Sequence, residues 1–122
     1  MPTTVRIHNG TRQQTLADHA VRAESFWARF RGLLGRSRLE AGEGMVFEPC
    51  NSVHMIGMRF AIDVIHLDKQ GTVVRVVPSL RPNRLGPLVW RSHIVVELPA
   101  GTAAATDTRV GDQVSIERVA SS

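Results

Sequence analysis

The sequence has one cysteine, one lysine and no tyrosine among its 122 residues, and it has no long apolar run. A single cysteine cannot close a disulfide within the chain, which is typical of a protein kept in a reducing compartment. No stretch reaches about 18 consecutive apolar residues, so no segment is expected to span a membrane. The first ten residues lack the basic and then apolar pattern of a signal peptide. We therefore expect a cytoplasmic protein without a membrane partner.

The positive charge comes almost wholly from arginine, because Lys69 is the only lysine while the net charge is +4. Arginine binds phosphate in a bidentate manner, which makes nucleic acid a partner to consider. Proteins that bind single strands stack the bases on aromatic side chains, and this chain has only four phenylalanines and two tryptophans. We therefore favour a bias towards arginine codons over a nucleic-acid partner.

The hydrophobic pattern predicts one all-β domain, 1–122, that is a sandwich or a distorted barrel. A hydrophobic content of 43% over 122 residues is enough for a single core. Short apolar runs separated by turn residues recur about every ten residues, as in sandwiches and barrels. The expected strands are residues 4–8, 16–22, 45–47, 60–67, 72–77, 94–98 and 113–119.

The period of the pattern changes once and predicts one short amphipathic α-helix near residues 25–34. Phe26 and Phe30 stand four residues apart, and further apolar residues follow at helical spacing. Ser25 is suited to cap the first turn, and Gly35 is suited to end the helix. A loop with three prolines, residues 78–87, is expected to be irregular.

Several sequence blocks stand in a specific order: FRGLLGR, GEGMVFEPC, SVHMIGMRFAIDVIHLD, VVELPAG and a late GD. From about Ala23 to Ile116, their order and spacing resemble the family known as domain of unknown function 192. The resemblance implies a compact β-sandwich-like fold with one helix. It also implies a small bacterial or archaeal protein without an established biochemical activity, so the resemblance leaves the function open.

One segment holds the candidates for chemistry. Cys50, His54 and Met58 are each four residues apart, which places them on one side of an extended segment. Thiolate, imidazole and thioether suit Cu(I), or Zn(II) if His66 and His93 supply further ligands. No CxxC pair is present, so we favour a buried, packed role for these side chains and expect no metal and no cofactor.

The same cysteine could act as a nucleophile. Cys50, with His54 as base and Asp63 as the acid that orients it, would have the parts of a thiol hydrolase or transferase. Arg59 could supply the positive charge that activates a thiol. The best-known signatures of cysteine hydrolases are missing from the sequence. A cysteine-dependent enzyme is therefore the alternative, and we favour a non-enzymatic role.

Two acidic residues interrupt apolar strands: Asp63 in FAIDVIHL and Glu97 in IVVELPAG. A carboxylate among apolar side chains must be paired or hydrogen-bonded. For Asp63 we predict either a pair with Arg59 or bonds to the backbone amides of a loop. For Glu97 we predict an arginine partner, either Arg59 or one from the loop 78–87.

Our leading hypothesis is a small non-enzymatic binding or accessory domain with a polar site in the segment 50–63. Two arginines on the proline-rich loop could join this site and hold phosphate or carboxylate, although solvated arginines are more usual. The partner would be a small molecule or a protein, and the chain a monomer or weak dimer. The candidate ligand-binding residues are Cys50, Ser52, His54, Met58, Arg59, Asp63, Arg81, Arg84 and Glu97.

Overall fold

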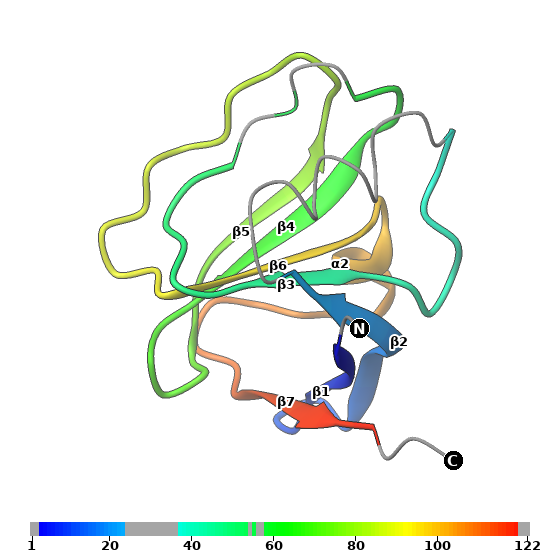
Figure 1. Ribbon diagram of the computed structural model, residues 1–122. Coiled ribbons are helices and arrows are strands. Elements are labelled where there is room, and N and C mark those ends of the chain that lie inside the picture. Colours follow the sequence, from blue (N-terminus) through cyan, green and yellow to red (C-terminus); the bar gives the residue numbers. More distant parts are fainter. Residues whose placement is uncertain (1–2, 24–36, 54, 56–57, 120–122) are drawn as a thin grey trace.

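The computed structural model describes residues 3–23, 37–53, 55 and 58–119. Within these residues the chain forms seven strands and one short helix (Figure 1). They are β1 (Thr3–Asn9), β2 (Gln14–Arg22), β3 (Met45–Phe47), β4 (Ile62–Leu67), β5 (Val73–Leu80), β6 (Ile94–Pro99), α2 (Thr102–Ala105) and β7 (Val114–Arg118). The helix predicted near residues 25–34 lies outside the described residues.

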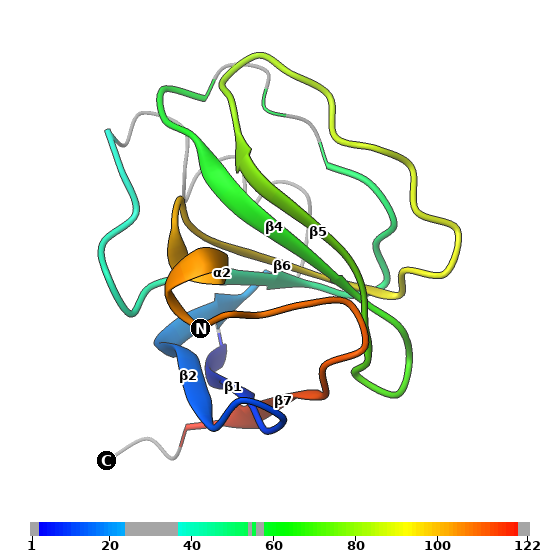
Figure 2. The same cartoon turned by 180° about the vertical axis from the view of Figure 1, so that it is seen from behind.

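The seven described strands form one sheet in the order β5-β4-β6-β3-β2-β1-β7. Neighbouring strands are antiparallel except β2 and β3, which run parallel with Val21 opposite Met45. The sheet curls until its two edges approach each other, and Thr72 forms an isolated antiparallel bridge with Gln113. Figure 2 shows the segment before β7 running toward the turn between β4 and β5. The all-β prediction is confirmed. We predicted either a sandwich or a distorted barrel, and the single curled sheet is a half-barrel, which corresponds to the second of these forms.

Gly71 permits the close approach of the two sheet edges. Its φ is +83°, and a β-carbon at this position would overlap the backbone carbonyl oxygen of Val114. The amide of Val114 donates to the Gly71 carbonyl at 2.9 Å. Glycine adopts a positive φ without steric cost. The turn at residues 68–71 therefore connects β4 to β5 and also joins this hairpin to the segment that begins β7.

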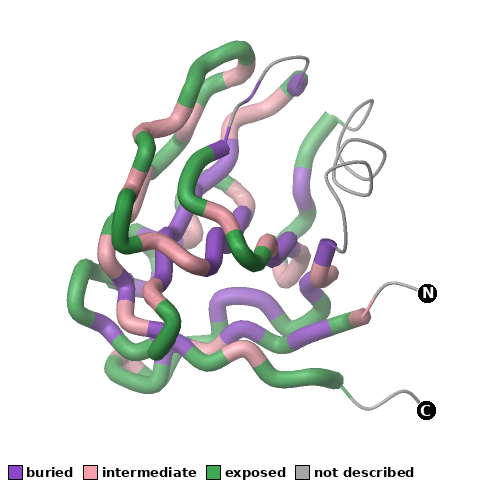
Figure 3. Tube along the Cα trace, turned by 60° about the vertical axis from the view of Figure 1, so that its left-hand side comes forward, coloured by how far each residue is buried: buried purple, intermediate pink, exposed green. Residues whose placement is uncertain are grey.

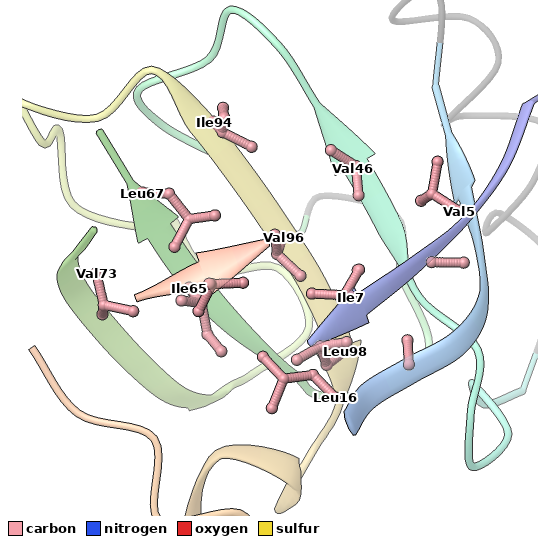
Figure 4. Packing of buried hydrophobic residues seen from close by; sticks show 13 residues of the cluster. Val5, Ile7, Leu16, Val46, Ile65, Leu67, Val73, Ile94, Val96 and Leu98 are labelled. Carbon is pink, nitrogen blue, oxygen red and sulfur yellow. The ribbon is translucent and has the colours of Figure 1, made fainter. Parts of the chain in front are cut away.

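The concave side of the sheet encloses an apolar group that we call the inner cluster. Every strand contributes to it, and Figure 4 shows its side chains meeting between β1, β4 and β6. Its buried members are Val5, Ile7, Leu16, Ala17, Ala20, Val46, Ile65, Leu67, Val73, Ile94, Val96, Leu98 and Val114.

The opposite side of β3, β4 and β6 carries a second group, the outer cluster. Loop residues supply much of it, so the loops form a layer over this side of the sheet. Its buried members are Ala23, Leu39, Met45, Val53, Met55, Met58, Ile62, Val64 and Val95. Figure 3 shows the result as buried central strands with exposed loops around them.

Strand β4 is buried along its whole length because it lies between these two clusters. Ile65 and Leu67 belong to the inner cluster, whereas Ile62 and Val64 belong to the outer cluster. A strand covered on both sides is expected to be apolar at almost every position rather than at alternate ones. The run IDVIHL has this character, and its two polar residues, Asp63 and His66, therefore need internal partners.

The strand boundaries differ from the predicted ones most at β5. The sequence predicted a strand over residues 72–77 and an irregular loop from residue 78, but β5 continues to Leu80. An edge strand tolerates proline, because the missing amide hydrogen has no neighbouring strand to serve. Pro78 lies where the pairing with β4 is irregular, between Ile62 opposite Leu80 and Val64 opposite Val77. β4 begins at Ile62 rather than residue 60, and α2 was not predicted.

Candidate functional site

Asp63 is fully buried and accepts three backbone hydrogen bonds. Its Oδ1 accepts from the amide of Ser79 at 2.9 Å. Its Oδ2 accepts from the amides of Gly101 at 3.1 Å and Ala103 at 2.8 Å. The predicted bonds from Asp63 to backbone amides are therefore confirmed, although only Gly101 lies in a loop, because Ser79 is in β5 and Ala103 is in α2. The carboxylate fixes the start of α2 and the end of β5, which is a structural task.

The three candidate catalytic residues are not brought together in the part of the chain that the structure describes. Side chains alternate along a strand, so Asp63 lies on the side of Ile65, in the inner cluster. Cys50 packs instead against the outer cluster, on the opposite side of the sheet. His54 lies outside the described residues.

Glu97 is buried in β6, directly opposite Met45 on β3 and Val64 on β4. Both neighbours belong to the outer cluster, so Glu97 is on the side of the sheet that the loops cover. Asp63 and Glu97 thus look alike in sequence but lie on opposite sides of the sheet. The arginine partner predicted for Glu97 stays a prediction.

Cys50 is half-buried and bonded to its surroundings through three of its atoms. Its thiol donates to the carbonyl of Ser52 at 3.1 Å, and its amide donates to the carbonyl of His93 at 3.0 Å. Its own carbonyl accepts from the hydroxyl of Ser92 at 2.9 Å. Met58 is buried in the outer cluster that Cys50 contacts. Among the described residues no three His, Cys, Asp or Glu side chains form a group that could hold a metal ion.

The candidate segment and the proline-rich loop that carries Arg81 and Arg84 are brought together as two paired loops, formed by residues 51–53 and 55 and by residues 81–91. Four backbone hydrogen bonds of 2.7 to 2.9 Å join them. The amide of Met55 donates to the Arg84 carbonyl, and the amide of Asn83 donates to the Met55 carbonyl. In the same way, the amides of Gly86 and Val89 donate to the carbonyls of Val53 and Asn51, respectively. Val53 and Met55 point into the outer cluster. Figure 1 shows the second loop bowing outward beyond the end of β5.

The outward side of the paired loops carries most of the remaining candidates. Arg81 and Arg84 are exposed, and so is Ser52. Arg59 is exposed as well, and the carboxylate predicted as one of its partners, Asp63, is bound to backbone amides. The structure therefore exposes these three arginines, and Asp63 is hydrogen-bonded without them.

Sequence reasoning missed a buried hydrogen-bond chain that begins at His66. Its Nδ1 lies 2.9 Å from the hydroxyl of Ser92, which donates to Cys50. A hydroxyl has one hydrogen, so Nδ1–H is the donor to Ser92 and Nε2 is unprotonated. Within the described residues, Nε2 is buried and makes no hydrogen bond. Burial, together with the charge of Arg75, lowers the pKa of His66 to about 4. The sequence feature that could have indicated this hydrogen-bond chain is His66, a polar residue within the apolar run FAIDVIHL.

A second polar group that the sequence did not reveal surrounds Asp112. Its Oδ2 accepts from Asn9 Nδ2, Arg12 Nε and the Arg109 amide, each at 3.0 Å. Burial alone would raise the pKa of Asp112, but the hydrogen bonds from Arg12, Asn9 and Arg109 outweigh it and lower the pKa to about 2. Asn9 also donates to Thr108 at 3.1 Å. This group ties the β1–β2 turn to the segment before β7, and it gives the late GD block a structural role.

Comparisons with known proteins identify a family and a fold. The family model of domain of unknown function 192, described as Uncharacterized ACR, matches residues 6–116. A solved protein of unknown function from Novosphingobium aromaticivorans is 22% identical, with a TM-score of 0.77; the match covers 93% of this chain and 84% of that one. A structure from Sinorhizobium meliloti, described as that of a proposed transcription regulator, is 20% identical with a TM-score of 0.73. That match covers 95% and 94%. At these identities the likeness shows the fold alone. No curated protein matches the chain.

Proposed function

Because the chain belongs to the family of domain of unknown function 192, which names no activity, we propose a function from its geometry. We propose that the protein is a small non-enzymatic binding or accessory domain. Its binding surface is the outward side of the paired loops, residues 51–53 with 55 and residues 81–91. The curled sheet serves as the scaffold that holds these loops.

The observation that carries this proposal is the backbone pairing of the two loops. Loops usually owe their shape to few contacts, and binding surfaces are often loops held by a rigid scaffold. Here the four hydrogen bonds between the loops fix their backbones, and Val53 and Met55 anchor them in the outer cluster. The arginines on the outward side therefore project from a prearranged backbone, which lowers the entropy lost on binding.

The contacts of the buried acid support binding over catalysis. An acid that orients a catalytic histidine must lie within hydrogen-bond distance of the ring, on the same side as the nucleophile that the ring activates. Both oxygens of Asp63 accept backbone amides, and Asp63 lies on the opposite side of the sheet from Cys50. The thiol hydrogen of Cys50 is engaged by the Ser52 carbonyl. These contacts explain both groups as parts of the fold.

A thermal-shift screen under reducing conditions tests the proposal. The panel contains Cu(I), Zn(II), nucleotides, sugars, small organic acids, an oligonucleotide, polyglutamate and lipid vesicles. A ligand at 100 times its dissociation constant adds about 2.7 kcal/mol to stability. We expect a stabilising ligand whose effect is lost in Arg81→Ala/Arg84→Ala and kept in Arg118→Ala, an exposed arginine on β7.

Two results would contradict the proposal. One is turnover of any substrate that disappears in Cys50→Ser. The other is a ligand whose effect is kept in the double arginine variant and lost in Cys50→Ser. A metal shift lost in both Cys50→Ser and His54→Ala would instead support the soft-metal alternative.

A further inference from the structure

Large apolar side chains project into solvent from one of the paired loops. Leu85 is 73% exposed, Leu88 is 53% exposed and Trp90 is 83% exposed. Among the described residues only Val110 and Val119 are large hydrophobic side chains of comparable exposure, and they lie elsewhere. Scattered single apolar residues are normal on a protein surface, whereas a group of them marks an interaction surface. The group on this loop is therefore the part of the surface to which a partner should be assigned.

Positive residues flank this apolar group along the loop. Arg81, Arg84 and Arg91 are exposed on the same loop, and no ion pair engages them within the described ranges. The chain has no aspartate or glutamate from Lys69 to Val96. Elsewhere in the described chain, five arginines pair with an acid: Arg6, Arg12, Arg22, Arg38 and Arg109. The three loop arginines stand out because they lie together in a stretch without acids, whereas Arg59, Arg75 and Arg118, which no ion pair engages within the described residues, are scattered. The partner is thus expected to be anionic.

The combination of cations with projecting leucines and a tryptophan distinguishes between anionic partners. A nucleic acid offers stacking surfaces to Trp90 and phosphates to the arginines, but it has no apolar layer for Leu85 and Leu88. An acidic protein would need a separate cavity for each projecting side chain. An anionic bilayer surface supplies phosphates above an apolar layer, and tryptophan is enriched at that boundary.

We propose that the outward side of the paired loops docks on the surface of an anionic lipid bilayer. Trp90, Leu85 and Leu88 enter the interfacial layer, and the flanking arginines contact headgroup phosphates. This inference rests on the proposed function, for which it names the partner.

The inference departs from the expectation that the protein has no membrane partner. That expectation rested on the absence of a spanning segment, and in the described parts of the chain no helix has the length and apolar character to cross a bilayer. Surface docking needs no such helix, because a few apolar side chains and nearby cations suffice for reversible binding. Docking on the surface of a bilayer is therefore compatible with the finding that no described helix could cross one.

Co-sedimentation with vesicles tests the inference on the full chain. One set of vesicles is about one-third phosphatidylglycerol and two-thirds phosphatidylcholine, and the other is phosphatidylcholine alone. We expect binding to the anionic set only, weakened several-fold at about 0.5 M salt. Each arginine removed from the loop should weaken partitioning about fivefold. Trp90→Ala should weaken it about tenfold or more.

Two matched controls separate docking from general effects. Arg118→Ala removes an exposed arginine on β7, and Val110→Ala truncates an apolar side chain that is 63% exposed. Both should bind as the wild type does, and all variants should keep the wild-type melting temperature because each changed side chain is exposed. The emission of Trp90, taken as the difference between wild type and Trp90→Phe, should shift to the blue when anionic vesicles are added.

The outcomes also separate this inference from the function it rests on. Equal binding by wild type and the loop variants would overturn the membrane inference. Binding of an oligonucleotide or polyglutamate through the same loop residues, with no vesicle binding, would overturn it too but leave the proposed function intact. Loss of vesicle binding in the loop variants alone would support both.

Discussion

The carboxylate of Asp63 on β4 accepts a hydrogen bond from the amide of Gly101 at 3.1 Å, across 38 residues of sequence. Gly101 has a φ of +95° and precedes the short helix α2. Asp63, the first aspartate of FAIDVIHLD, and Gly101, the glycine of VVELPAG, are therefore joined by one hydrogen bond. It connects the centre of the sheet to the turn after β6.

This relationship predicts a large loss of stability when Asp63 is truncated. Asp63→Ala leaves three backbone amides, of which that of Ala103 is buried, without their acceptor and should cost about 3–5 kcal/mol of unfolding free energy. Asp63→Asn keeps one acceptor oxygen and should cost less. Urea unfolding measures both, and Asp68→Ala is the control, because Asp68 also accepts two amides but lies at a partly exposed turn. Equal losses at the two positions would contradict the role of Asp63.

A second prediction concerns His66 and acid. The folded state lowers its pKa from 6.5 to about 4, because burial and the charge of Arg75 disfavour the protonated ring. The folded state thus binds fewer protons than the unfolded state between these values. The stability from the neutral ring is fully present above pH 6.5 and is lost as pH falls toward 4. The loss amounts to about 1–3 kcal/mol after allowance for solvent screening.

Urea unfolding across this pH range measures the effect. The slope of stability with pH should decrease in His66→Gln and persist in His19→Gln, which changes an exposed histidine on β2. A slope that survives in His66→Gln would show that another group titrates.

Asp112 gives a companion test at lower pH. Burial raises its pKa, but hydrogen bonds from Arg12, Asn9 and Arg109 lower it from 3.8 to about 2. Its carboxylate therefore stabilises the fold above pH 3.8, and this contribution is lost as pH falls through 2. Asp112→Asn should cost about 2–4 kcal/mol at neutral pH. Carboxyl titration followed by NMR should show the low pKa of Asp112.

The closure of the sheet edges predicts a difference between two glycines. Gly71→Ala must adopt a positive φ and also overlap the Val114 carbonyl, whereas an added β-carbon at Gly111, where φ is +96°, would meet nothing within 4 Å. Gly111→Ala should therefore cost about 1 kcal/mol, the conformational part alone. Gly71→Ala should cost about 2–4 kcal/mol because the backbone must also shift. Similar unfolding free energies for the two variants would show that the edges separate easily.

Cys50 provides a test of the enzymatic alternative. Its thiol is half-buried and donates to the Ser52 carbonyl, so we expect it to react with iodoacetamide more slowly than a free thiol near neutral pH. The rate is compared with that of the unfolded chain in urea. A faster reaction in the folded state would favour a nucleophilic role.

The sequence by itself determined the strands and the turns between them. Alternating apolar residues and turn signals are local, so β3 was located with its exact bounds. The blocks of the family also stand in the sequence, and their order and spacing were enough to assign most of the chain to its family. Local signals did not indicate that β5 continues past Pro78, because tolerance of proline depends on the strand being at an edge.

Only the tertiary structure decided what the polar residues do. Asp63 and Glu97 are both single acids in apolar strands, yet the register of β4 against β6 places them on different faces. Asp63 lies opposite Leu98 on the side of the inner cluster, and Glu97 lies opposite Val64 on the side of the outer cluster. Pairing of residues 51–53 and 55 with 81–91 depends on backbone hydrogen bonds between distant segments, which no local pattern encodes. The physical reason is that burial and hydrogen-bond partners are set by strand order, and strand order is decided by contacts between residues far apart in the chain.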